Sequence, residues 1–179
     1  MSKPNAFDLM MKAPQSSEKK TKNGYSIIKG SERTEENSCY LLQFDGLSEP
    51  NPGISTGGAV VFYPDSRKIF FERGEYIDFA TNNQAEYRGL LIGVQSALEM
   101  GIKNLLIEGD SQLIIFQTEG KWKVKNEVLK ELNKEVKDLI SQFDFVAIRH
   151  IYRENNQHSD RITNDVFKSK QSFFRKFTT

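Results

Sequence analysis

Apolar and polar positions along the middle of the chain follow two periods. Residues 40–44 alternate, and their nearly continuous apolarity is typical of a strand buried on both faces. Farther on, Leu90, Val94 and Leu98 recur at helical spacing and form one apolar stripe. Along the whole chain, the two periods predict strands at 40–44, 59–63, 68–76, 105–107 and 145–148, and helices at 82–100, 111–120, 127–143 and 156–168.

This order of elements predicts an α/β fold. The first three strands, joined by turns such as Pro64-Asp65-Ser66, favour an antiparallel meander. The later strands alternate with helices, which favours parallel pairing. We therefore expect a five-stranded mixed sheet, three strands antiparallel and the rest parallel, with helices on both faces. The folded domain is predicted to span residues 37–168.

The two ends of the chain differ from this domain. Residues 1–36 are rich in lysine, serine and glutamate with little apolar periodicity, which predicts a flexible N-terminal extension. An apolar cluster within it is either a peptide that docks on a partner or part of a disordered end. Its members are Phe7, Leu9, Met10 and Met11. Residues 169–179 form a basic, aromatic C-terminal tail.

Composition narrows the class of protein. With 179 residues, 37% of them hydrophobic and 27% charged, the chain suits one soluble domain with tails, and we expect a monomer. We find no apolar run long enough to span a membrane and no signal-peptide pattern. The single Cys39 excludes an internal disulfide and a cysteine-cluster zinc site. We expect an intracellular location, either cytoplasmic or nuclear.

Charge is unevenly distributed along the chain. The formal net charge of +1 combines +2 for residues 1–36, −5 for residues 37–160 and +4 for residues 161–179. An acidic centre does not attract a polyanion unless bound cations or the basic ends assist.

Four acidic residues fall where strands end and helices begin, the places where sites collect in α/β proteins. Asp45 and Asp110 follow predicted strands, and Glu86 and Asp160 lie on predicted helices. Taken singly, each has an ordinary explanation as a turn former, a helix cap or an acid near a helix N-terminus. Together they repel one another unless hard divalent cations, Mg²⁺ or Mn²⁺, bind them. Two such ions about 4 Å apart assist in-line attack on a phosphodiester.

Four motifs carry a specific resemblance to a known family. They are Phe44-Asp45-Gly46 with Asn51-Pro52-Gly53; Thr81-Asn82-Asn83-Gln84-Ala85-Glu86; Glu108-Gly109-Asp110-Ser111; and residues 150–164, with Arg153, Asn156, Asp160 and Asn164. Residues 40–167 resemble a type 1 ribonuclease H domain of the archaeal-like branch, which lacks a basic handle between the middle helices. The resemblance implies a ribonuclease H-like fold and an endonuclease that cuts the RNA strand of RNA–DNA hybrids, leaving 5′-phosphate and 3′-hydroxyl ends.

The resemblance also implies roles for single residues. The expected catalytic acids, which would ligate two Mg²⁺ or alternatively Mn²⁺ ions, are Asp45, Glu86, Asp110 and Asp160. Either His150 or Arg153 is expected to assist at the scissile phosphate or in product release. The expected substrate-binding residues are Ser48, Asn51, Asn83, Gln84, Trp122 and Lys123. Amides can test for the 2′-hydroxyl that DNA lacks, although Asn51 and Asn83 could instead serve the turn and the helix cap.

Two departures from the family pattern concern the site. Ser159 precedes the last acid, where the family usually has alanine, and adds polarity there. Residues 120–125 join two helices directly, where the bacterial branch has its basic handle. Within them, Trp122 and its alternating lysines either grip the DNA strand by charge and stacking or form a surface cluster around a packed ring.

The tail has the spacing of a peptide that binds a sliding clamp. Gln171, Phe174 and Phe177 occupy the key positions, and Thr178 stands where an aromatic residue is usual. Clamp docking would suit removal of RNA primers in DNA replication. Alternatively, Phe173 and Phe174 cover the core, or the basic tail anchors nucleic acid.

Other functions fit parts of the pattern. A non-catalytic hybrid-binding module would not need all four acids. The ribonuclease H part of a reverse transcriptase would follow a polymerase, which nothing in this sequence resembles. A related nuclease that also cuts double-stranded RNA is separated only by assays on both substrates.

Overall fold

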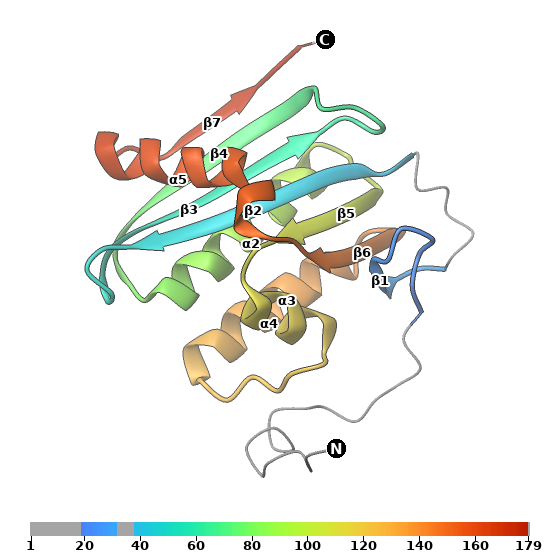
Figure 1. Ribbon diagram of the computed structural model, residues 1–179, viewed down its shortest axis with the longest axis horizontal. Coiled ribbons are helices and arrows are strands. Elements are labelled where there is room, and N and C mark those ends of the chain that lie inside the picture. Colours follow the sequence, from blue (N-terminus) through green and yellow to red (C-terminus); the bar gives the residue numbers. More distant parts are fainter. Residues whose placement is uncertain (1–18, 32–37, 179) are drawn as a thin grey trace.

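The computed structural model describes residues 19–31 and 38–178, which form one mixed sheet with helices on both faces (Figure 1). The strands are β1 (Ser26–Lys29), β2 (Tyr40–Ser48), β3 (Gly53–Phe62), β4 (Ile69–Ala80), β5 (Asn104–Gly109), β6 (Phe145–His150) and β7 (Phe173–Lys176). The helices are α2 (Asn82–Glu99), α3 (Gln112–Glu119), α4 (Glu127–Ile140), α5 (Gln157–Ser169) and the 3₁₀ turn η2 (Arg153–Asn155). The predicted α/β class and the order of its central elements are confirmed.

The sheet has the strand order β1-β6-β5-β2-β3-β4-β7. Strands β2, β3 and β4 form the predicted antiparallel meander, whereas β2, β5 and β6 are parallel. Because of this pairing, the C-terminal ends of β2, β5 and β6 point to the same end of the sheet. In α/β proteins binding sites form at that end.

Two short edge strands correct the prediction of five strands. β1 comes from the segment predicted to be a flexible extension, and it pairs antiparallel with β6. β7 comes from the predicted tail and pairs antiparallel with β4. Each has only four residues, too few for a clear period. Residues 1–18, with the apolar cluster of Phe7 to Met11, and residues 32–37 lie outside the described residues.

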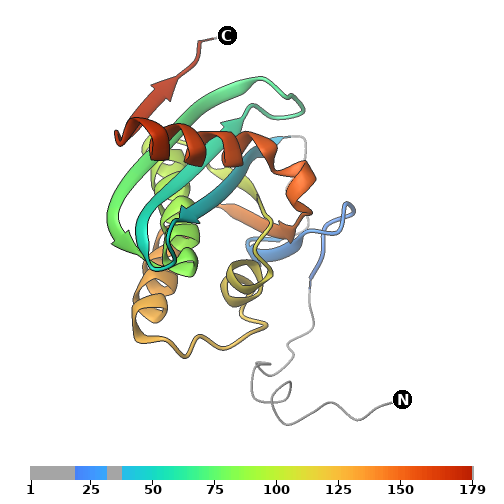
Figure 2. The same cartoon turned by 60° about the vertical axis from the view of Figure 1, so that its left-hand side comes forward.

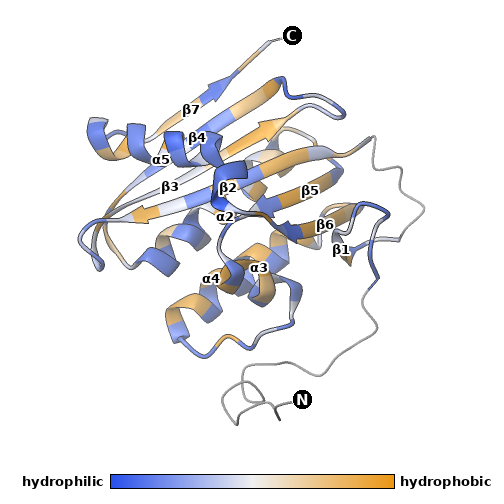
Figure 3. Cartoon of the chain, in the orientation of Figure 1, coloured by the Kyte–Doolittle hydropathy of each residue, from blue (hydrophilic) through white to orange (hydrophobic). Residues whose placement is uncertain are grey.

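The helices divide between the two faces of the sheet. Helix α2 packs on β2 and β3 and against α4, while α5 crosses the other face over β3 (Figure 2). The larger core lies on the α2 side and includes Phe44, Leu90 and Val136, all fully buried. A smaller cluster of Val60, Phe62 and Ile162 lies beneath α5. Hydrophobic residues accordingly dominate the central strands, whereas α5 is largely hydrophilic (Figure 3).

In the part of the chain that the structure describes, no helix combines the length and apolarity needed to cross a membrane.

Candidate active site

Three carboxylates converge at the C-terminal ends of β2 and β5, as the sequence predicted. Asp45 lies on β2, Glu86 on α2 and Asp110 directly after β5. Strands β2 and β5 are neighbours, with Phe44 opposite Gly109, so the two aspartates emerge side by side. One carboxylate oxygen from each of the three acids lies within 4.8 Å of the other two.

Close backbone packing of α2 on β2 brings Glu86 beside Asp45. Helix α2 begins with a capping box, in which the Thr81 hydroxyl accepts from the Gln84 N–H and the Gln84 side chain accepts from the Thr81 N–H. The helix then crosses β2 at two glycines. A Cβ on Gly46 would overlap the backbone of residues 85–86, and one on Gly89 would overlap the Asp45 carbonyl. Only glycine permits this approach, which sets Glu86 beside Asp45.

The three acids repel one another without a compensating cation. Burial, followed by the charge of Asp110, raises the pKa of Asp45 to about 7. Burial, followed by the charges of Asp45 and Asp110, raises the pKa of Glu86 well above its ordinary value. Among the described residues none of the three is ion-paired with a cation, and Glu86 Oε2 is buried with no hydrogen-bond partner. Oxygen ligands of this kind suit a hard divalent cation.

Asp160 approaches this group without joining it as closely. It lies in the first turn of α5, and its charge contributes to the raised pKa of Asp45. It is not among the three acids whose oxygens lie within 4.8 Å of one another. Its Oδ1 instead lies 3.7 Å from the Arg153 guanidinium, whose side chain is 83% exposed. A rotation of either side chain would change this pairing.

His150 and Arg153 are placed differently. His150 Nε2 lies 3.1 Å from the Asp110 carbonyl oxygen, so this nitrogen carries a proton and donates it to the main chain. The His150 ring therefore supports the Asp110 turn through Nε2. Arg153 remains exposed beside Asp160.

Asn156 belongs to the last of the four motifs, and its role in the site was not predicted from the sequence. It is fully buried, and its Nδ2 donates to the Phe44 carbonyl at 2.9 Å and to Asp110 Oδ2 at 3.2 Å. Its Oδ1 accepts from the Ser159 hydroxyl at 2.7 Å. Ser159 is itself buried, so this departure from the family pattern orients Asn156. Asn156 in turn fixes the Asp110 carboxylate.

The expected substrate-binding amides lie around the start of α2. Asn83 is exposed, and Asn51 is exposed with its Oδ1 accepting from the Asn82 N–H at 3.0 Å. Gln84 uses its oxygen in the capping box and keeps its amide N–H₂ available. Ser48 is buried, and its hydroxyl donates to the carbonyls of Ala80 and Pro50. Ser48 therefore holds the end of β2 in place.

The segment between α3 and α4 contains no extra helix, as expected for a chain without the basic handle. Trp122 is half-buried and packs edge-on against Phe116, with ring centroids 5.0 Å apart. Lys123 is exposed. Lys125, on the same segment, is exposed as well.

The C-terminal tail completes the far edge of the sheet. The Phe177 N–H donates to the Phe70 carbonyl at 2.9 Å, and the half-exposed Phe174 ring lies 5.5 Å from that of Phe71. Phe173 packs against the cluster beneath α5. Phe173 thus covers part of the core, as one of the alternatives expected, whereas Phe174 lies half exposed beside Phe71.

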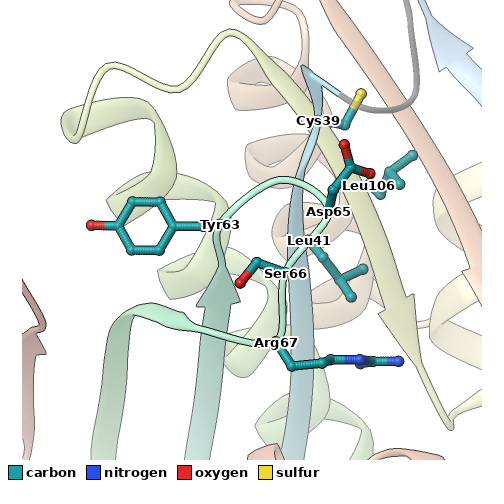
Figure 4. Close-up of a pocket in the computed structure, with 7 residues that line it drawn as sticks. All are labelled: Cys39, Leu41, Tyr63, Asp65, Ser66, Arg67 and Leu106. Carbon is teal, nitrogen blue, oxygen red and sulfur yellow. The ribbon is translucent and has the colours of Figure 1, made fainter. Parts of the chain in front are cut away.

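A separate cavity of about 290 Å³ lies near the start of β2, away from the strand ends that carry the acids (Figure 4). Its lining residues are Cys39, Leu41, Tyr63, Asp65, Ser66, Arg67 and Leu106. It shares no residue with the acidic group.

Comparison with known proteins places the chain in a family. Residues 43–166 match the family model described as "Reverse transcriptase-like". The chain is 38% identical over 126 residues to a bifunctional protein of Mycobacterium tuberculosis, covering 70% of this chain and 35% of that protein. It is 35% identical over 123 residues to ribonuclease HI of Halobacterium salinarum, covering 69% of this chain and 61% of that protein. The chain thus spans about a third of the mycobacterial relative's length.

Solved structures agree with these matches. The N-terminal RNase H domain of the M. tuberculosis protein superimposes with a TM-score of 0.71 at 36% identity, covering 74% of this chain and 95% of that one. RNase H1 of H. salinarum gives a TM-score of 0.70 at 33% identity, covering 73% and 98%. The fold and the group of three acids together define a ribonuclease H-like protein. More narrowly, the chain belongs to the type 1 ribonuclease H family.

Proposed function

We propose that this protein is an endoribonuclease that hydrolyses the RNA strand of RNA–DNA hybrids. The observation that carries the proposal is the convergence of Asp45, Glu86 and Asp110 without a compensating cation. Family membership supports the same reaction. So does LC11-RNase H1, solved in complex with an RNA/DNA hybrid, which superimposes with a TM-score of 0.68 at 27% identity over 74% of this chain and 99% of that one.

The acidic group suits divalent cations, and we propose two Mg²⁺ ions, with Mn²⁺ as a substitute. Asp45, Glu86 and Asp110 would hold them, with Asp160 as the fourth ligand. When bound, such ions supply activation of the attacking water and stabilisation of the departing oxygen, which gives 5′-phosphate and 3′-hydroxyl ends.

Residues around the acids would hold the substrate. Asn156 keeps the Asp110 carboxylate in place. Exposed Arg153 would bind the scissile phosphate or ease product release, with His150 fixing the neighbouring turn. The amides of Asn51, Asn83 and Gln84 would read the 2′-hydroxyls of the RNA strand, because an amide both donates and accepts.

Two further contacts belong to this proposal. Trp122 and Lys123 would bind the DNA strand, chiefly through the lysine charge. Docking to a sliding clamp through Gln171, Phe174 and Phe177, in the course of DNA replication, requires part of β7 to leave the sheet. This requirement weighs against the docking, because Phe174 already packs on Phe71.

The direct test is cleavage of a hybrid labelled on its RNA strand, with double-stranded RNA and duplex DNA of the same sequence in parallel. We expect the RNA of the hybrid to be cut in Mg²⁺ and left intact in excess chelator. Hybrid binding without cleavage in either Mg²⁺ or Mn²⁺ would show that the protein is a non-catalytic hybrid-binding module. Equal cutting of double-stranded RNA would make the protein a broader ribonuclease.

A further inference from the structure

The segment that precedes β2 forms an arm beside β6, at the edge of the sheet. The arm comprises residues 19–29, which turn at residues 21–24, where Gly24 has a φ of +82°. The Ile27 N–H donates to the Lys19 carbonyl at 2.8 Å, and β1 then pairs with β6. The match to the family model begins only at residue 43, so the arm is additional to what the family model describes.

The arm ends against a buried polar row that crosses three strands. Gln43 on β2 lies opposite Glu108 on β5, and Glu108 lies opposite Arg149 on β6. Glu108 is 4% exposed, and its Oε2 accepts from Gln43 Nε2 at 2.8 Å while its Oε1 accepts from Arg149 at 2.6 Å. The three side chains therefore tie neighbouring strands together.

Tyr25 of the arm completes this row. Its hydroxyl donates to Glu108 Oε1 at 2.6 Å, and its ring lies 4.2 Å beneath the Arg149 guanidinium. Burial, followed by the charge of Glu108, raises the pKa of Tyr25 far above its ordinary value, so the hydroxyl remains a donor. Arg149 also donates to the Asn23 carbonyl at 3.1 Å. The arm thus binds both members of an ion pair whose carboxylate is buried.

The polar row lies immediately behind the candidate active site. The next residue along each strand is Phe44, Gly109 and His150, and the aspartates Asp45 and Asp110 follow on β2 and β5. Gln43 Nε2 also approaches the Asn155 carbonyl at 3.4 Å, next to the residue that holds Asp110. A change in the row would therefore shift the strand ends and the turn before α5 together.

We propose that the arm is a working part of the active site and that Tyr25 is a positioning residue for the carboxylates. By holding Glu108, Tyr25 fixes the relative positions of β2, β5 and β6 beside Asp45, which lies on β2, and Asp110, which directly follows β5. The spacing of these oxygens determines how well they bind divalent cations. The expected effect on cleavage rests on the proposed function, whereas the expected effect on Mg²⁺ binding does not.

The test compares Tyr25→Phe with Tyr63→Phe in the full-length chain. Tyr25→Phe retains the ring over Arg149 and removes only the hydroxyl. Tyr63→Phe removes a hydroxyl that bonds the Phe177 carbonyl at 3.5 Å, away from the acids. Thermal melting of both variants would establish that each is folded at the assay temperature. Calorimetric titration with Mg²⁺ and steady-state kinetics of hybrid cleavage would then be measured.

We expect Tyr25→Phe to weaken Mg²⁺ binding about tenfold and to lower kcat by a similar factor, with KM for the hybrid little changed. Tyr63→Phe should match the wild type in both assays. Mg²⁺ affinity and kcat of Tyr25→Phe within about twofold of Tyr63→Phe would overturn the inference. Absence of cleavage by the wild type would instead refute the proposed function, and the Mg²⁺ titration would still decide the role of Tyr25.

Discussion

Buried carboxylates occur in this protein in two contrasting surroundings. Glu72, on β4, is 2% exposed and lies 2.7 Å from both His158 and Arg161 and 3.5 Å from Arg175. In the acidic site, Asp45 on β2 is 7% exposed and its nearest charged neighbours are other acids. Both arrangements bury negative charge, but only the first supplies the positive charge that offsets it.

The difference separates a structural role from a functional one. A buried carboxylate surrounded by cations holds segments together, and Glu72 joins β4 to α5 and β7. A cluster of carboxylates without cations destabilises the folded protein, and such clusters persist where a ligand supplies the missing charge. The contrast thus points to Asp45, Glu86 and Asp110 as the ligand site, without reference to any relative.

The largest expected effect comes from removing one of the uncompensated acids. Asp110→Asn should lower hybrid cleavage by at least roughly 10³-fold, because metal-assisted charge stabilisation contributes several kcal/mol to the transition state. Hybrid binding should persist, and a gel-shift titration would measure it. Cleavage close to wild type in this variant would show that the acids are not the reactive centre.

The next effect is on stability as a function of pH in metal-free protein. The pKa of Asp45 rises from 3.8 in the unfolded reference to about 7 in the fold, so between these pH values the folded state binds more protons. The contribution of Asp45 to stability therefore falls as pH rises from about 4 to 7. Relative to Asp45→Asn, the wild type should lose roughly 2–4 kcal/mol across this window.

Denaturant unfolding of both proteins at pH 4 and pH 8 would measure this loss. Mg²⁺ should restore stability to the wild type at pH 8 and have little effect on Asp45→Asn. A constant difference between the two proteins at all pH values would contradict the raised pKa.

A moderate effect is expected at the compensated carboxylate. Glu72→Gln should lower the free energy of unfolding by roughly 2 kcal/mol, because it removes the negative charge that Arg161 and Arg175 contact. Cleavage per folded molecule should remain unchanged. Loss of activity in the folded variant, without loss of stability, would remove the distinction between the two surroundings.

The smallest effect is expected at the rim of the acidic site. Arg153→Gln should raise KM or slow product release by less than about tenfold, since an exposed charge near a phosphate contributes about 1 kcal/mol. Steady-state and single-turnover kinetics would separate the two. A loss as large as that of Asp110→Asn would make Arg153 an essential group.

Much of this arrangement was predictable from the sequence. The central strands and helices have clear periods, and the acids lie in motifs whose order matches a known family. Period 2 in residues 40–44 and the apolar stripe on α2 predicted the neighbouring elements that bring Asp45 and Glu86 together. Strands β2 and β5, the first and fourth of the predicted strands, are neighbours in the sheet, and this pairing brings Asp45 and Asp110 side by side.

The remaining features depend on contacts between distant segments. Glu72 acquires its cations from α5 and β7, and neither partner is marked by local spacing. The edge strand β1 carries no period, because Ser26–Lys29 is short and its pairing with β6 decides its conformation. The hydrogen bond from Asn156 to Asp110 likewise joins residues far apart in sequence. Such partners become visible only when the chain is folded.

Calorimetric titration of the metal-free protein with Mg²⁺ at pH 8 tests the central claim most directly. The wild type and Glu72→Gln should show saturable binding of similar affinity, whereas Asp45→Asn should show almost none. Equal binding by all three proteins would contradict the account, because Mg²⁺ would then not depend on the uncompensated acids.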